Sequence, residues 1–567
     1  MRRFKVLSLL LIFLGVSFLA VAQNATIKGK VTNQSGKGIE GITILVKGTS
    51  KGTATNADGS FSIEAPAGAT LIFSGAEYVT QEVALKGRTT LDISLTSKEN
   101  ELSTVTVTAL GISRQSKTLV YATQNVKTSE LTGVRDPNNM LNSLTGKVAN
   151  AVVTQGSGGP GSGARIVLRG NRSIQGSNNA LIVVDGVPID NSTYSAAGSD
   201  FGSIQGTDGA SNINPDDIAS VTVLRGASAA ALYGSQAGNG VIVITTKKGS
   251  KDRMSVSINS GAVFESPFAL PKVQNTYGQG NSGSFDSSAG ASWGPKMAGQ
   301  SIVNFLGNST TLSAQPDNIK DFFRTGASFN NSISVSGGTE KAQTYLSYTN
   351  KSIQGIIPRN NLGSNTIDLR LTNQISKKFS TDAKVTYINE NIKNRPRTGE
   401  ENAPVIDIYS IARNLSLDEA KQYQYINNVG VPSAYANYPS TNTGIYQDPY
   451  WMIYNTSLNQ IRNRVMGFVS AKYMLTNWLS FTGRANLDKT FDKLTSQYMQ
   501  GTILWAHTGG YYQQQNIETT QKWFDGIFEG NNNITDDLKI NYHAGAIYQD
   551  AKSDILTNTA DGLTVTN

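Results

Sequence analysis

Apolar and polar residues alternate with a period of two along much of the chain. Near the start of the longest such region, the apolar Met254, Val256 and Ile258 alternate with the polar Ser255, Ser257 and Asn259. This pattern predicts strands with one apolar and one polar face. The further strand candidates in this region, about eight to ten in all, include residues 332–336, 344–349, 367–372, 383–389, 464–474, 479–488 and 540–548.

The alternation over residues 251–567 admits two interpretations. Apolar-out and polar-in alternation is the pattern of a transmembrane β-barrel wall. It equally suits a secreted β-sandwich or adhesin, so this region taken alone leaves both open. A tight turn at residues 337–340, between the candidates at 332–336 and 344–349, predicts a hairpin in either case.

The N-terminus breaks the alternation with one continuous apolar run. Arg2, Arg3 and Lys5 precede the run at residues 6–20, and small residues follow at 20–22. This order predicts a secretory signal peptide over residues 1–22, with a retained membrane anchor as the alternative. No long apolar stretch recurs, so a mature protein that enters a membrane would do so as a β-barrel.

Residues 23–97 are predicted to form a small β-sandwich. Alternating apolar residues at 27–31, 42–46 and 91–95 mark strands, and the segment 56–59 (NADG) marks a tight turn. An EF-hand calcium loop with Gly59 at its sixth position would need acidic residues where alanines stand, so the hairpin turn is the better interpretation.

Residues 98–114 form a predicted linker, and residues 115–250 mix short strands with glycine-rich loops. Buried strands are expected at 151–153, 165–168, 181–184 and 241–244. The glycines at 156, 158 and 161 match the spacing of a dinucleotide-binding loop. A proline at 160 and a following strand replace the helix that such a loop needs, so we expect no nucleotide site.

Composition then narrows the function by exclusion. The 567-residue chain has no cysteine, two histidines (His507 and His543) and a net charge of +8. Disulfides, thiolate metal sites and a lipidated N-terminal cysteine are therefore excluded. The chain shows no acid/base motif and no basic cluster, and we expect no enzyme activity, no metal or cofactor, and no nucleic-acid partner.

Two segments resemble known families. Residues 29–31 (GKV), 41–49 (GITILVKGT) and 52–63 (GTATNADGSFSI) resemble the carboxypeptidase regulatory-like domain, a transthyretin-like sandwich. The resemblance does not imply peptidase activity, because the zinc site of carboxypeptidases lies in a different domain.

The second resemblance is to the plug domain of TonB-dependent outer-membrane receptors of the SusC/RagA type. It rests on residues 169–173 (RGNRS), 180–189 (ALIVVDGVPI), 214–234 (NPDDIASVTVLRGASAAALYG) and 240–249 (GVIVITTKKG), and continues in short motifs such as DPYW at 448–451. The residues that we single out in these plug motifs are Arg169, Gly170, Asp185, Gly186, Pro188, Arg225, Gly226, Tyr233 and Gly234.

The resemblance implies a fold and an activity. The fold would be mainly β: the sandwich, an α+β plug, and an antiparallel transmembrane barrel that is incomplete in this chain. The activity would be TonB-dependent import of glycan or peptide oligomers across the bacterial outer membrane, together with a SusD-like surface lipoprotein. The alternative from another class is a secreted or surface carbohydrate-binding protein.

The resemblance also assigns two candidate contact sites. The extended segment Thr104, Val105, Thr106, Val107, Thr108, Ala109 and Leu110 stands directly before the plug, where the family carries its TonB box. An extended segment can bind by adding a strand to a partner's sheet edge, although an ordinary strand of the sandwich is the alternative. Residues 402–460 hold eight tyrosines, and we expect Tyr446, Tyr450 and Trp451 to contact substrate or the lipoprotein, or to lie in an interfacial girdle.

The strand count makes us expect a longer receptor. Plugged outer-membrane transporters have about 22 strands, more than twice what residues 251–567 supply. An incomplete barrel would leave a free edge in lipid. The chain also ends in LTVTN without a terminal aromatic residue. We therefore expect the sequence to be an N-terminal fragment or an incomplete record.

Overall fold

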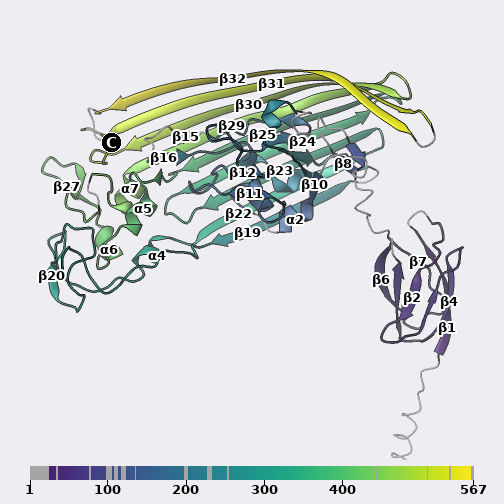
Figure 1. The fold of residues 1–567 in the computed structure, drawn as a ribbon, viewed down its shortest axis with the longest axis horizontal. Coiled ribbons are helices and arrows are strands. Elements are labelled where there is room, and N and C mark those ends of the chain that lie inside the picture. The colour runs from purple at the N-terminus through teal and green to yellow at the C-terminus, as the bar shows by residue number, and fades with distance from the viewer. Residues whose placement is uncertain are drawn as a thin grey trace, which may run out of the picture. The chain divides into compact units, whose positions relative to one another are not determined.

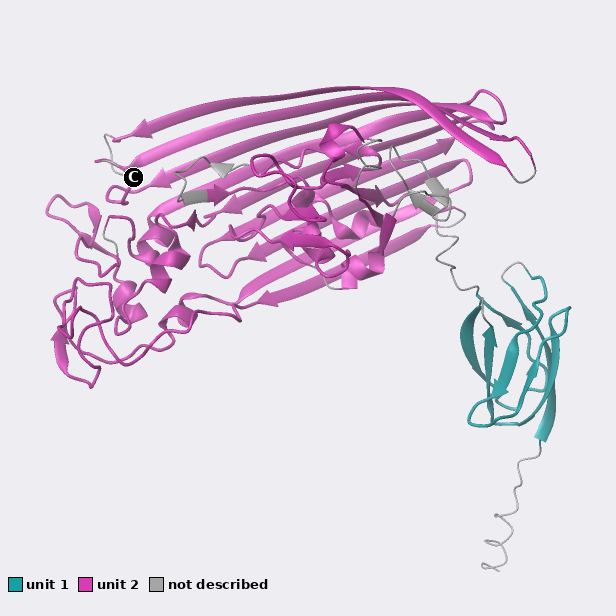
Figure 2. Cartoon of the chain, in the orientation of Figure 1, with its two compact units in different colours: residues 1–106, 114–119 teal, residues 107–113, 120–567 magenta. Residues whose placement is uncertain are grey.

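The structure is a computed structural model in which two compact units are separately defined (Figure 2). The described residues are 24–33, 36–75, 78–96, 105–107, 113–115, 123–133, 136–193, 195–196, 202–225, 233–251, 254–441, 444–506, 508–535 and 538–563. Unit 1 comprises residues 1–106 and 114–119, and unit 2 comprises residues 107–113 and 120–567. The expected signal peptide lies outside the described residues. No helix among the described residues is long and apolar enough to cross a membrane.

Unit 1 is a β-sandwich built on the predicted alternation. One sheet has the order β4-β1-β7, with bounds Ser60–Pro66, Asn24–Thr32 and Ile93–Ser94. The other has the order β3-β2-β5-β6, with bounds Gly52–Ala54, Thr43–Val46, Thr70–Gly75 and Tyr78–Ala84. The alternating residues Ile27, Ile44, Phe61 and Phe73 are buried in one core. Gly59 has φ +85°, as the predicted turn requires.

Two short strands follow the sandwich. β8 (Val105–Val107) and β9 (Ser113–Gln115) form a two-stranded sheet. β8 is the central part of the predicted TonB box, and Thr104 and residues 108–110 lie outside the described residues.

The plug begins unit 2 with a five-stranded sheet in the order β10-β17-β18-β13-β14. The bounds are Thr123–Lys127, Ile218–Leu224, Val241–Thr246, Leu181–Val184 and Val187–Pro188. β13 and β18 are parallel, and the other neighbours are antiparallel. Short helices surround the sheet: α2 (Thr128–Gly133), η5 (Met140–Leu144), η6 (Ala210–Asn212), η7 (Pro215–Asp217) and η8 (Ser235–Ala237).

Three of the four buried plug strands expected from sequence are buried, and one is not. β12 (Arg165–Leu168), β13 and β18 contribute to the plug cores. β11 (Ala151–Thr154) pairs only with β12, outside the five-stranded sheet, and its Val152 is 62% exposed. The expectation of burial was wrong for one face of β11: Ala151 and Val153 pack against the plug core, whereas Val152 points the other way.

Residues 254–563 contain an antiparallel nine-stranded sheet (Figure 1). Its order is β19-β22-β23-β24-β25-β29-β30-β31-β32, and each neighbour pair is antiparallel. The bounds are Ser255–Glu265, Gly326–Gly338, Ala342–Gln354, Asn361–Gln374, Phe379–Lys393, Thr456–Met474, Leu479–Tyr498, Tyr511–Asn533 and Lys539–Asp561. The predicted hairpin at residues 337–340 is confirmed as the β22–β23 turn.

The two faces of this sheet have opposite chemistry. On β23 the polar Ser347 and Thr349 are buried, while Leu346 and Tyr348, which alternate with them, are exposed. The same inversion runs along the neighbouring strands, where exposed large apolar residues include Ile367, Val385, Val465, Leu487, Phe491, Phe524 and Phe528. A water-soluble sheet shows the reverse arrangement, so the apolar face needs an apolar partner.

Two long insertions between strands of the sheet pack against each other. Residues 266–325 contain β20 (Ser301–Val303), β21 (Ser309–Thr311) and α4 (Asn318–Phe322). Residues 394–455 contain β26 (Thr398–Gly399), α5 (Pro404–Tyr409), α6 (Leu417–Ala420), β27 (Gln424–Ile426), β28 (Pro432–Ala434) and α7 (Pro449–Tyr454). We call these two segments together the cap. Their shared core includes Phe305, Phe322, Ile408, Leu415 and Tyr450.

A further small sheet links plug and cap. It has the order β15-β16-β26, where β15 is Ser195–Ala196 and β16 is Gly202–Gln205. The plug therefore contacts the cap as well as the polar face of the nine-stranded sheet.

Candidate functional site

The plug contacts the polar face of the sheet at three places, and the first is the turn between β13 and β14. Asp185 and Gly186 both have positive φ, +50° and +88°, which is the backbone of the type I′ turn that an Asp-Gly pair favours. Just beyond the turn, Gln521 of β31 donates from Nε2 to the carbonyl oxygen of Pro188 at 2.9 Å. Three plug residues singled out from sequence thus lie together at this contact.

The carboxylate of Asp185 is surrounded by donors. Arg370 of β24 donates from Nη1 to its Oδ1 at 3.0 Å, and Lys384 Nζ of β25 lies 3.6 Å from its Oδ2. Within the plug, Thr246 donates from its backbone N–H at 3.0 Å and from its hydroxyl at 2.7 Å. Burial alone would raise the pKa of Asp185, but the two cations outweigh it and hold the pKa far below its usual range.

Arg484 of β30 holds the main chain of the same turn. Its Nη1 donates to the carbonyl oxygen of Asp185 at 2.9 Å, and its Nη2 donates to that of Gly186 at 3.3 Å. Its Nε is fixed by Asp525 of β31 at 2.9 Å. The turn is therefore bound both by its charge and by its backbone.

The second contact is the plug loop at residues 205–212, which two neighbouring arginines of β29 hold by its main chain. Arg462 donates from Nη1 to the carbonyl oxygen of Asp208 at 3.1 Å. Arg464 donates from Nη1 to that of Gly209 at 2.9 Å. The two arginines are two positions apart on one strand, so their side chains share the polar face.

Carboxylates of the neighbouring strand orient these arginines. Asp492 and Asp488 of β30 lie 2.8 Å and 2.6 Å from Nη2 of Arg462 and Arg464, respectively. Arg395, just beyond β25, adds a third donor to the loop and contacts the carbonyl oxygen of Gln205 at 2.8 Å. Guanidinium groups suit this task because one planar fork can bind a carboxylate and a carbonyl at once.

The plug loop is itself stiffened by Asp208. Its carboxylate accepts from Asn139 Nδ2 at 3.0 Å and from the backbone N–H groups of Ala164 and Ser211 at 2.9 and 2.8 Å. Burial outweighs these hydrogen bonds and raises the pKa of Asp208 above its usual value. The carbonyls that the arginines bind are thus presented from a fixed loop.

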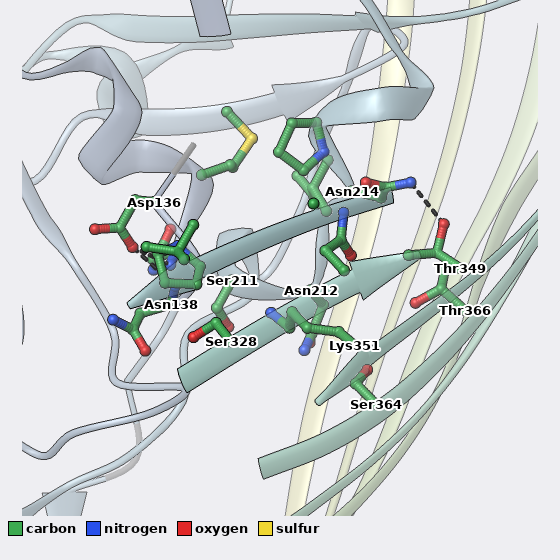
Figure 3. A pocket seen from close by; sticks show the side chains of 18 of the residues that line it. Asp136, Asn138, Ser211, Asn212, Asn214, Ser328, Thr349, Lys351, Ser364 and Thr366 are labelled. Carbon is green, nitrogen blue, oxygen red and sulfur yellow. Dashed lines mark hydrogen bonds between the residues drawn. The ribbon is translucent and has the colours of Figure 1, made fainter. Parts of the chain in front are cut away.

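The third contact surrounds η7. The hydroxyl of Ser332 donates to Asp216 at 2.7 Å, and that of Tyr345 donates to Asp217 at 2.8 Å. Asn214 donates from Nδ2 to the Thr349 hydroxyl at 2.7 Å (Figure 3).

A cavity of about 70 Å³ lies beside this third contact, between the plug and strands β22 to β24 (Figure 3). Its polar lining includes Asp136, Asn212 and Ser364, and Lys351 projects into it from the sheet. The plug therefore does not fill the space in front of the sheet at this point, although the cavity is too small for an oligomer.

The plug–sheet contact contains many hydrogen bonds and ion pairs, and it also has an apolar part, in which Ile388 of β25 and Met466 of β29 pack in the plug core. Replacing a buried ion pair by apolar residues is often neutral or stabilising, whereas removing one partner is strongly destabilising. The charged and hydrogen-bonded groups of this contact therefore specify where the plug sits on the sheet.

The remaining plug residues predicted from sequence have structural places. Arg169 and Gly170 have φ +61° and +84° and form the turn after β12. Tyr233 is buried in a plug core, and Gly234 has φ +72°. Arg225 donates to Gln124 of β10. Gly226 lies outside the described residues.

The three aromatic residues of the cap differ in exposure. Trp451 is fully buried and donates from Nε1 to the Thr502 hydroxyl at 3.0 Å. Tyr450 is buried against Phe322. In this structure neither ring offers a face to substrate or to a lipoprotein, because both belong to the packed interior of the cap; that expectation is corrected for these two residues. Tyr446 is partly exposed.

Sequence reasoning did not find the five arginines of the plug–sheet contact. They are Arg370, Arg395, Arg462, Arg464 and Arg484. A signal was present, because Gln460 and two of the arginines follow each other at a spacing of two residues on β29. Their carboxylate partners come from other strands, and only the strand register brings them together.

Two protein-family models match the chain in the order of its units. The CarboxypepD_reg-like domain matches residues 27–108, and the TonB-dependent Receptor Plug Domain matches residues 116–241.

The curated relatives are TonB-dependent receptors. TonB-dependent receptor SusC of Bacteroides thetaiotaomicron is 30% identical over 542 residues, which are 94% of this chain and 49% of SusC. TonB-dependent receptor P26 of Formosa agariphila is 26% identical over 547 residues, 95% of this chain and 51% of P26. The chain thus spans about half the length of these relatives.

Among solved structures, the RagAB peptide importer in its open-open state matches with a TM-score of 0.61 and 18% identity, over 80% of this chain and 50% of that one. The RagAB peptide transporter matches with a TM-score of 0.59 at 18% identity, over 79% and 50%. These likenesses concern the fold, which is that of a TonB-dependent receptor. Both domain models match in order, and the similarity to SusC extends over 94% of this chain. The chain therefore belongs to the TonB-dependent receptors of the SusC/RagA type.

Proposed function

We propose that the protein is an active transporter of the bacterial outer membrane that imports oligomeric nutrients, glycans or peptides, by moving its plug. The observation that carries this proposal is the polar contact between plug and sheet. Five arginines hold the plug mainly by carbonyl oxygens, so displacing it breaks hydrogen bonds that water can replace.

The two-faced sheet supports a membrane location. Its exposed face carries Leu346, Ile367, Val385, Val465 and Phe524, while the opposite face carries the charged groups that bind the plug. Apolar residues facing lipid and polar residues facing the lumen are the arrangement of an outer-membrane barrel wall. A secreted sandwich or adhesin would bury the apolar face instead, so we favour the transporter over that alternative.

The energy for plug movement would come from TonB, gripping residues 104–110. The middle of this segment, β8, is already extended. Strand addition binds main-chain groups, which explains why small and β-branched side chains suffice there. A pull on this segment would load the plug, which follows it directly in the chain.

A SusD-like lipoprotein is the proposed partner on the outer surface. The cap supports this, because the two insertions form a packed body of their own rather than free loops. The solved neighbours named as a peptide importer support an oligomeric cargo, although the cargo of this chain is chosen by loops and by the partner.

Cross-linking the plug to the nine-stranded sheet tests the proposal. The chain has no cysteine, so cysteines at Asn214 and Thr349, whose side chains are hydrogen-bonded, can be joined selectively by a short thiol cross-linker. Expressed within the complete receptor, the cross-linked pair should block growth on the imported oligomer, and either single cysteine should not. Unchanged growth with a fully cross-linked plug would refute import by plug movement.

Heat-modifiable migration separates the transporter from the adhesin. The complete receptor, extracted from outer membranes, should migrate differently before and after boiling, as folded barrels do. A protein of unchanged migration that appears in the soluble or secreted fraction would support the adhesin instead.

A further inference from the structure

The cap contains two buried carboxylates that lack the partners such groups need. Asp407 of α5 is 3% exposed, and neither of its carboxylate oxygens accepts a hydrogen bond from the described residues. Asp448, which precedes α7, is 2% exposed. Its Oδ1 accepts from the backbone N–H of Tyr450 at 2.8 Å, but its Oδ2 has no hydrogen-bond partner among the described residues.

The two carboxylates come from elements that pack against each other: Asp407 lies in α5, and Asp448 is the N-cap of α7. The negative charge of Asp448 adds to burial in raising the pKa of Asp407 well above its usual value. The backbone N–H of Gln447 faces Asp407 and favours its charged form, without the geometry of a full hydrogen bond. Because Gln447 directly precedes Asp448, this places the Asp407 side chain beside the start of α7.

A buried hydroxyl points to the same place. Tyr438 is 7% exposed, and its phenolic oxygen has no hydrogen-bond partner among the described residues. After burial, the charges of Asp448 and Asp407 are the main influences that raise its pKa. Tyr438 packs in the same core as Ile408 of α5 and Tyr450 of α7, so three unsatisfied oxygen-bearing side chains lie in one packed region of residues 394–455.

Within the described ranges, no positive side chain balances this cluster. Among the described residues, no lysine, arginine or histidine forms an ion pair with Asp407 or Asp448. A buried, unpaired carboxylate is costly, and two neighbouring ones are more so. Either a cation neutralises them or they carry protons.

We propose that Asp407 and Asp448, with the hydroxyl of Tyr438 beside them, bind a hard divalent cation, and that this cation is Ca²⁺. The donors are all oxygen atoms, which Ca²⁺ prefers, and their irregular placement suits its flexible coordination. In the described part of the chain, no group of three or more His, Cys, Asp or Glu residues is placed to hold a metal ion, so carbonyl oxygens and water must complete the shell.

Two carboxylates give a site of the affinity found in extracellular modules, with a Kd of about 10⁻⁴ to 10⁻³ M. This proposal departs from the expectation, drawn from the sequence, of no metal in the protein.

Binding at this place would fasten the cap. Asp407 and Asp448 come from the two ends of one insertion. Next to Asp448, Gln447 donates to the carbonyl oxygen of Gly501 at 2.8 Å, and Trp451 donates to the hydroxyl of Thr502. Gly501 and Thr502 lie in the loop between β30 and β31. A cation between the two carboxylates would therefore hold the insertion closed and seated on that loop.

Terbium luminescence tests the site directly. Tb³⁺ replaces Ca²⁺ in oxygen sites and is excited through a nearby phenol or indole, here Tyr438 or Trp451. The full chain in detergent should show sensitised Tb³⁺ emission that CaCl₂ displaces. Asp407→Asn should weaken Tb³⁺ binding at least tenfold. The matched control is Asp418→Asn, because Asp418 lies in the same insertion but on its surface, paired with Lys421.

Thermal unfolding provides the second measurement. The wild-type midpoint should rise on adding CaCl₂ after EDTA, and that of Asp407→Asn should not. In EDTA the variant should be at least as stable as wild type, because the charge repulsion is gone; an isosteric amide that merely broke the fold would be less stable. If Asp407→Asn fails to fold, Asp448→Asn replaces it in the test. Its amide oxygen can still accept the hydrogen bond from the backbone N–H of Tyr450, and its thermal midpoint should likewise not respond to calcium.

Three outcomes would overturn the proposal. In the first, the wild-type protein shows neither sensitised Tb³⁺ emission nor a thermal midpoint that depends on calcium. In the second, Asp418→Asn loses as much Tb³⁺ binding as Asp407→Asn. In the third, the wild-type protein at neutral pH shows the infrared band of a protonated carboxyl group, which Asp407→Asn removes and calcium leaves unchanged. The last would mean that the carboxylates hold protons instead of a metal.

Discussion

Arg464 and Asp488 form a buried ion pair on the polar face of the nine-stranded sheet, with Nη2 2.6 Å from Oδ2 and Nε 2.8 Å from Oδ1. The remaining nitrogen of the guanidinium, Nη1, donates to the carbonyl oxygen of Gly209 in the plug. One side chain therefore satisfies a carboxylate of the wall and holds the plug at the same time.

Arg464→Met should be strongly destabilising, because it leaves Asp488 buried without its partner. The expected loss is about 3–5 kcal/mol in the free energy of unfolding, measured by urea titration of the heat-modifiable form. Lys489→Met is the control: its pair with Glu518 is partly exposed, and less than about 1 kcal/mol should be lost. Equal losses in the two variants would contradict the special role of the buried pair.

The docking of Asp185 should depend on pH in one direction. Arg370 and Lys384 hold the pKa of Asp185 below its unfolded value of about 4. Its contribution is therefore complete above about pH 4 and declines as the pH falls further. Asp185→Asn should lower the thermal midpoint at pH 7, and its difference from wild type should shrink below pH 4. A difference that grows on acidification would have the wrong sign.

Val107→Pro should abolish uptake by the complete receptor while leaving expression and membrane insertion intact. Val107 lies in β8, and proline removes the N–H that strand addition to TonB would use. Val107→Ala keeps that N–H and should retain uptake. If the alanine variant fails as completely as the proline variant, side-chain recognition rather than strand addition operates at this segment.

Trp451 should prove structural and Tyr446 functional. Trp451→Ala removes a fully buried ring, and its expected cost is about 3–5 kcal/mol in the stability of the cap. Trp451→Phe, which loses only the hydrogen bond to Thr502 and part of the ring, should leave oligomer affinity unchanged, as measured by isothermal titration. Tyr446→Ala, at a partly exposed site, should weaken affinity without changing stability. The reverse pattern would restore Trp451 as a ligand contact.

Much of the fold follows from local pattern. The β22–β23 hairpin and the strands at residues 367–372 and 383–389 are visible because apolar and polar residues alternate along most of their length. β31 (Tyr511–Asn533) was not predicted, because its first half, with three successive glutamines at 513–515, is polar on both faces. A strand that extends past the apolar band loses the alternation by which it is recognised.

The candidate site was only half predictable. The Asp185–Gly186 turn stands out because a turn with two positive φ angles selects those residues. The arginines that bind the plug do not stand out in the sequence. Arg464 and Asp488, for example, meet only because of the register between two long strands, and the local sequence pattern does not determine that register. Trp451 shows the opposite error: a segment rich in aromatic residues suggested a binding loop, yet the rings supply the core of the cap.

The sheet contacts much of the plug through its main chain: the carbonyl oxygens of Asp185, Gly186, Pro188, Asp208 and Gly209 are the bound groups. Glycine itself is required at position 209, where a Cβ would lie 2.0 Å from the carbonyl oxygen of Asp190. The wall thus recognises the course of the plug backbone. A plug from a related receptor that follows the same course, with different residues at most of these positions, should be accepted in exchange, so plug and barrel could be recombined as interchangeable parts.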